Sequence, residues 1–138
     1  MKWTATITKI GKQAIEPKGN MVILFGENVT PELVDVSVIQ KFDPQTPLTG
    51  FIMKKGDTVT IDGQTYVADF VGSMVASDMR ALGHVTLFFN QKKSKNPLAN
   101  GVYFTLEDKL TMPEFNIGDD IIYEHIWLGW FDGLREET

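Results

Sequence analysis

The sequence predicts a small, mainly β protein: an antiparallel β-barrel or sandwich with one or two short helices. Many short segments alternate apolar and polar residues and follow one another at close spacing, separated by turn residues. Long helical patterns are missing between them, whereas a parallel sheet needs a covering helix after nearly every strand. The length of 138 residues fits one continuous core. We therefore expect residues 1–138 to form a single domain.

Strands are expected where alternating or wholly apolar runs lie between turn residues. One pair of these runs is separated by Asp62-Gly63, which supplies the two positive-φ positions of a type I′ turn and so predicts a hairpin. The expected strands cover residues 3–7, 21–25, 34–40, 58–61, 64–71, 84–89, 102–106, 109–112 and 121–123.

Two short helices are expected between the strands. Thr30 followed by Pro31 is typical of a helix start and predicts about one helical turn. Residues 77–82 have helical composition, with Ser73 or Ser77 as the cap. Gly83 stands where a helix ends in a left-handed residue.

Composition excludes several classes of site and partner. Without cysteine, the chain has no disulfide, thiolate nucleophile or zinc–thiolate site. The net charge of −5 argues against a nucleic-acid partner, which would require a basic face. No apolar run approaches the roughly 20 residues of a membrane span, and the alternating N-terminus is unlike a signal peptide. We therefore expect a cytoplasmic protein.

His84 is the candidate reactive side chain. Strand alternation places it on the same face as Thr86, and an imidazole beside a hydroxyl can act as nucleophile or proton carrier. The helix start near Ser73 and Ser77 could offer N–H groups to a phosphate or another anion. Alternatively, His84 is a structural histidine whose ring nitrogens bond to backbone carbonyls. The local pattern alone favours this second interpretation.

His125 is expected to be an ordinary half-exposed histidine at the end of the last strand. It is far from His84 in the chain, and the tightly spaced carboxylates or cysteines that accompany metal ligands are missing, so no metal site is expected. The glycines form neither a phosphate-binding loop nor a nucleophile elbow, and no cofactor is expected.

The C-terminal extension, from about residue 126, is rich in aromatic residues. Trp127, Trp130 and Phe131 are costly to leave in water. They either pack back on the domain or bury against a second copy of the chain as a homo-oligomer, and the sequence leaves both open.

Two blocks of residues resemble one known family. Val71-Gly72-Ser73, Arg80, the run from Leu82 to Leu87 (LGHVTL) and Phe89 resemble the characteristic stretch of the glucitol/sorbitol-specific IIA components of the bacterial phosphotransferase system. Thr6-Ile7-Thr8, Ile10-Gly11 and Ala14 resemble the opening of that family, in the right order. The resemblance covers about residues 4–124.

The resemblance implies a cytoplasmic phosphocarrier, a phosphohistidine phosphotransferase. Such a protein accepts a phosphoryl group from the histidine-containing phosphocarrier HPr. It passes the group to the IIB unit of a IIB/IIC sugar-alcohol permease, and meets the membrane only through that permease. His84, the one histidine in a block that matches the family, is the candidate acceptor on this hypothesis. Thr86 is then its possible hydroxyl partner, and Ser73 and Ser77 at the helix start are the candidate phosphate contacts.

One position departs from the family pattern. The phosphoryl-accepting histidine of the family follows an aromatic-Ile or apolar-Ile pair, and the residue after Val38-Ile39 here is Gln40. A carboxamide cannot form a phosphoramidate. Either His84 is the acceptor instead, or the chain has the alternative function of a IIA-like binding or regulatory module that has lost phosphotransfer.

Overall fold

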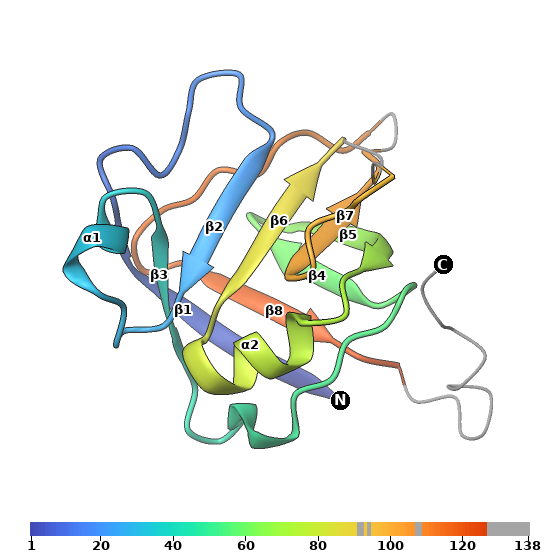
Figure 1. Cartoon of the computed structure of the whole chain (residues 1–138), viewed down its shortest axis with the longest axis horizontal. Coiled ribbons are helices and arrows are strands. Elements are labelled where there is room, and N and C mark those ends of the chain that lie inside the picture. Colours follow the sequence, from blue (N-terminus) through green and yellow to red (C-terminus); the bar gives the residue numbers. More distant parts are fainter. Residues whose placement is uncertain (91–92, 94, 107–108, 127–138) are drawn as a thin grey trace.

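The structure is a computed structural model that describes residues 1–90, 93, 95–106 and 109–126. Strands supply most of its regular structure, and two α-helices and one short 3₁₀ helix (η1) lie between them (Figure 1). The elements in chain order are β1 (Lys2–Ile10), β2 (Met21–Phe25), α1 (Pro31–Val34), β3 (Val38–Phe42), η1 (Leu48–Gly50), β4 (Thr58–Ile61), β5 (Gln64–Val71), α2 (Val75–Leu82), β6 (Val85–Phe89), β7 (Gly101–Phe104) and β8 (Asp120–Glu124).

The strands close into a barrel in the order β1-β3-β2-β6-β7-β5-β4-β8, and β8 pairs back onto β1. This confirms the expected mainly β barrel. Two neighbouring pairs, β2–β3 and β6–β7, run parallel, and the other pairs run antiparallel. The chain returns to the start of β3 through α1, and to the start of β7 through the loop after Asn90. These short connections replace the long covering helices that extended parallel sheets use.

The predicted hairpin is confirmed. Asp62 and Gly63 have φ values of 54° and 69°, and Ile61 pairs directly with Gln64 across the turn. Both left-handed residues match the right-handed twist of the two strands, which is why this dipeptide is favoured in such turns.

Two strand predictions were wrong in part or in whole. Val34 ends α1, and β3 begins only at Val38, because the helix started by Pro31 continues for four residues. Residues 109–112 form no strand. Instead, the backbone N–H of Thr111 donates to Gln64 Oε1 (3.0 Å), and its carbonyl accepts from the Tyr66 hydroxyl (2.6 Å). Burial raises the pKa of Tyr66 to about 12, so this hydroxyl remains a donor.

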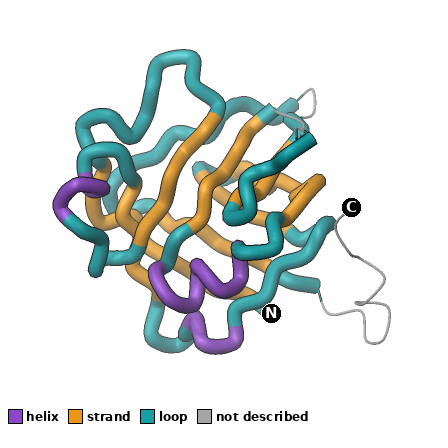
Figure 2. The backbone as a smooth tube through the Cα atoms, viewed as in Figure 1, coloured by secondary structure: helices purple, strands orange, loops and turns teal. Residues whose placement is uncertain are grey.

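α2 begins at Val75, and the predicted serine cap was wrong. Met74 is the N-cap and no side-chain hydrogen bond caps the helix, because the Ser77 hydroxyl lies inside the first turn and donates to Met74 O (3.1 Å). The predicted C-terminal residue is confirmed: Gly83 has a φ of 60°. α2 buries Val75 and Met79, and Figure 2 shows it at the same end of the barrel as η1.

None of the helices in the described ranges is long and apolar enough to cross a membrane. Residues 127–138, which include the aromatic segment of the C-terminal extension, lie outside the described residues.

Candidate functional site

His84 stands between the end of α2 and the start of β6. The N–H of Gly83 bonds to the carbonyls of Asp78 and Met79, and the N–H of His84 lies 3.4 Å from Asp78 O. Gly83 also packs against the backbone of Gly26, where an added Cβ would lie 2.9 Å from Gly26 N. A left-handed glycine is therefore required both by the turn and by the close approach.

The imidazole of His84 is held on both of its nitrogens. Nδ1 lies 2.9 Å from Leu24 O, and because a carbonyl can only accept, Nδ1 carries the proton. Nε2 then carries the lone pair, to which the side-chain amide of Asn100 donates. The ring stacks on Phe25 with centroids 3.9 Å apart and planes inclined by 7°. His84 is half-buried, so this ordered imidazole lies at the surface of the barrel.

The other predicted site residues are placed differently. Thr86 shares the outer face of β6 with His84, as alternation predicted, but it is buried, and among the described residues no hydrogen bond joins the two. Ser73 and Ser77 lie toward the opposite end of α2. A helix of eight residues is about 12 Å long, so the structure does not bring these serines to His84.

Gln40 lies in β3 and is 1% exposed. Burial raises the pKa of Tyr123 above its ordinary value, so its hydroxyl stays protonated and donates to Gln40 Oε1 over 2.8 Å. That contact fixes the orientation of the amide, and Gln40 Nε2 donates to Gly83 O over 3.0 Å. Both ends of this carboxamide are therefore used within the protein.

A groove of about 460 Å³ lies over Gln40, between the C-terminal end of α2 and the loop after β2. Leu82 lines this groove and is 55% exposed. Arg80, which also lines it, donates its Nε hydrogen to Phe51 O. Phe25 lines the groove and also stacks on His84, so the two features adjoin. The sequence did not predict the groove. Its lining comes from segments far apart in the chain and has no local pattern: Phe25, Gly26, Glu27, Asn28, Val29, Thr30, Leu33, Gln40, Phe42, Leu48, Arg80, Ala81, Leu82 and Gly83.

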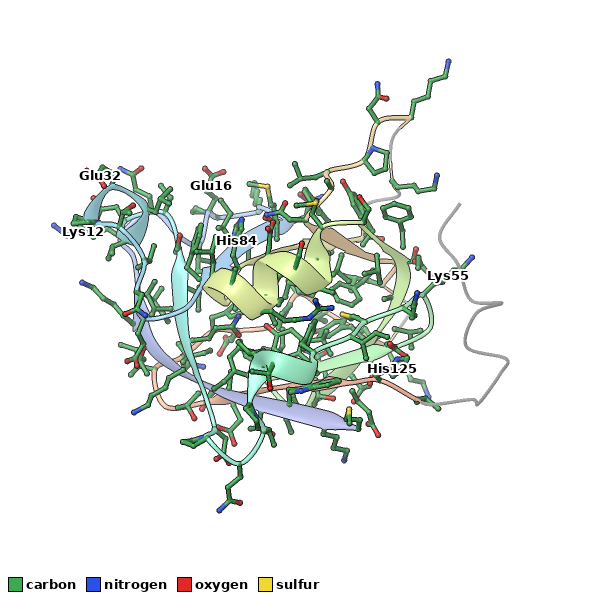
Figure 3. All side chains as sticks on the ribbon, turned by 60° about the horizontal axis from the view of Figure 1, so that its bottom comes forward. Lys12, Glu16, Glu32, Lys55, His84 and His125 are labelled. Carbon is green, nitrogen blue, oxygen red and sulfur yellow. The ribbon has the colours of Figure 1, made fainter. Side chains whose placement is uncertain are left out.

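The expectation that His125 is half-exposed was wrong. It is 3% exposed, and its Nδ1 lies 2.6 Å from Oδ2 of Asp57, which is wholly buried. Figure 3 shows His125 well apart from His84. The backbone of His125 also exchanges hydrogen bonds with Met1, which places it beside the N-terminus. Within the described part of the chain, no group of three or more metal-ligating side chains occurs.

Comparison with known proteins gives two matches. The sequence model of a family described as the glucitol/sorbitol-specific IIA component of the phosphotransferase system (PTS) matches residues 2–122. The crystal structure of a PTS IIA component from Enterococcus faecalis V583 is 32% identical in sequence and superposes with a TM-score of 0.76. That alignment covers 87% of this chain and 98% of the other. No curated protein matches the chain.

Proposed function

This chain belongs to the family of glucitol/sorbitol-specific IIA components of the phosphotransferase system, and from that premise we propose that it is a cytoplasmic phosphocarrier of that system. It takes a phosphoryl group from HPr and passes it to the IIB unit of a sugar-alcohol permease. The protein contacts the membrane only through the IIB and IIC components of that permease. The observation that supports this role is the half-exposed imidazole of His84, held in the tautomer that leaves the lone pair on Nε2.

The proposed reaction needs little from the protein. His84 Nε2 attacks the phosphorus of phospho-HPr, a new N–P bond forms, and the electron pair of the broken N–P bond returns to the imidazole of the donor. The Nδ1–H of His84 keeps its bond to Leu24 O, which favours the positive charge that develops on the ring. The groove beside Phe25 and the exposed Leu82 supply a surface on which HPr and the IIB unit can dock in turn.

The test is incubation with phosphoenolpyruvate, enzyme I and HPr. We expect stoichiometric, acid-labile label on the wild-type chain and none on His84→Ala, because the other histidine, His125, is buried and bonded to Asp57. Circular dichroism of His84→Ala checks that the variant is folded. Label that persists in His84→Ala would move the acceptor elsewhere, and an unlabelled wild type would end the carrier proposal.

A second candidate function is supported by Gln40. If this residue occupies the position of the family's acceptor, the chain is a IIA-like module that binds its partners without carrying phosphate. Gln40 is buried and bonded at both ends of its amide, as suits a structural side chain. The same incubation separates the two functions: this one expects HPr to bind to an unlabelled wild-type chain, and label that vanishes in His84→Ala excludes it.

We propose in addition that the aromatic segment of Trp127, Trp130 and Phe131 joins two copies of the chain, since so many rings are costly to expose. Replacing all three by alanine is expected to lower the mass measured by sedimentation equilibrium from that of an oligomer to that of one chain. An unchanged mass would mean that these residues do not hold an assembly together.

A further inference from the structure

Asn100 reaches His84 through the pairing of the strands. Its carbonyl accepts from the N–H of Thr86 (3.1 Å), two residues beyond His84 on the same strand segment. The next residue, Gly101, is paired with Thr86 in the parallel β6–β7 ladder. An added Cβ on Gly101 would lie 2.9 Å from the ring of Phe88, so the backbone approaches β6 closely there. The position of Asn100 over the imidazole is thus set by backbone contacts on both sides.

The direction of the hydrogen bond between Asn100 and His84 Nε2 is also determined. Leu24 O holds the proton of His84 on Nδ1, so Nε2 can only accept and the Asn100 amide must donate. This leaves the Nε2 lone pair occupied by Asn100. An incoming phosphoryl group needs that same lone pair.

Both side chains are half-buried, so the contact lies at the surface. Rotation of the Asn100 side chain alone uncovers Nε2 and leaves the backbone bonds of Asn100 and Gly101 in place. The uncovered amide is a neutral donor of two hydrogens, which suits it to phosphoryl oxygens close to Nε2.

We propose that Asn100 is a positioning residue that covers His84 Nε2 in the resting protein and donates hydrogen bonds to the phosphoryl group once His84 carries it. This inference rests on the proposed function with His84 as the acceptor. In the resting state the amide keeps the neutral imidazole in one tautomer. In the phosphorylated state the same amide opposes loss of the phosphoryl group.

The experiment compares the full-length wild type with Asn100→Asp, Asn100→Ala and a matched control, Asn96→Asp. Asn96 is exposed in the same loop, and its substitution adds the same charge. The first measurement is the ¹⁵N NMR spectrum of the His84 imidazole. We expect an unprotonated Nε2 in the wild type and in Asn96→Asp. In Asn100→Asp we expect a protonated Nε2, because a carboxylate accepts where the amide donated. A purely structural role would leave the tautomer unchanged.

The second measurement is the lifetime of the label after phospho-HPr is removed. In Asn100→Ala we expect roughly tenfold faster loss, since a hydrogen bond to a charged group is removed, and in Asn96→Asp an unchanged lifetime. If label forms normally but neither tautomer nor lifetime responds to Asn100, the inference is wrong and the proposed function stands. If no chain is labelled, the proposed function fails, and the phosphoryl part of the inference fails with it whatever the tautomer.

Discussion

Asp57→Asn is expected to lower the free energy of unfolding by about 3–5 kcal/mol, because buried groups that bond to the carboxyl oxygens lose that acceptor and each unmet buried group costs about 1–3 kcal/mol. The wholly buried carboxylate accepts hydrogens from His125 Nδ1 (2.6 Å), Lys54 N (2.7 Å) and Ile126 N (3.2 Å). The amide of an asparagine replaces one accepting oxygen by an NH2 group, which cannot accept a hydrogen bond from any of these donors. The same contacts join the turn before β4 to the end of β8, so the loss reaches both segments.

Urea unfolding followed by circular dichroism measures the effect. Glu124→Gln is the matched control, because Glu124 is a half-exposed carboxylate at the end of β8, next to His125 in the chain. Its substitution should stay within about 0.5 kcal/mol of the wild type. A loss below about 1 kcal/mol in Asp57→Asn would contradict the structural role.

The parts of the fold that depend on neighbouring residues could be predicted from the sequence. The left-handed preference of Asp62-Gly63 and of Gly83 is a property of these residues themselves, and the structure confirms both turns. Alternation correctly placed His84 and Thr86 on the same face, because adjacent strand residues point to opposite sides; the structure shows that this face is turned away from the core cluster.

The parts that depend on distant residues could not be predicted. His125 and Asp57 are 68 positions apart, and nothing near either residue signals the other. An isolated histidine at a strand end is usually half-exposed, so the expectation followed the local pattern and missed the partner. Nothing in the sequence near Asn100 signals His84 either. Its contact with His84 arises only because β6 and β7 pair in parallel.

The family resemblance supplied what local patterns could not. On its own pattern His84 was better interpreted as structural, and the structure does show both ring nitrogens bonded, one to a backbone carbonyl and one to Asn100. We propose the same imidazole as the phosphoryl acceptor because His84 is the histidine in a block that matches the IIA family, whereas Gln40 stands at the family's own acceptor position. The contacts themselves are compatible with both roles, which is why labelling and the Asn100 variants are the informative experiments.

Gln40→Leu is expected to lower the free energy of unfolding by about 3 kcal/mol. Leucine fills a similar volume but leaves the Tyr123 hydroxyl and Gly83 O without the partners that they have in the barrel interior, and each unmet buried group costs about 1–3 kcal/mol. Gln45→Leu, at an exposed position in the loop after β3, is the matched control and should have little effect.

A double-mutant cycle with Tyr123→Phe identifies the cause of that loss. If the unmet hydroxyl contributes, Gln40→Leu/Tyr123→Phe is less destabilised than the sum of the two single variants, because the double variant no longer buries a lone hydroxyl. Strict additivity would mean that the hydrogen bond between these side chains contributes nothing. Gly83 O accepts from Gln40 immediately before His84, so Gln40→Leu should also shift the His84 NMR signals. That shift would make Gln40 a support for the candidate acceptor, and its absence would confine Gln40 to the stability of the barrel.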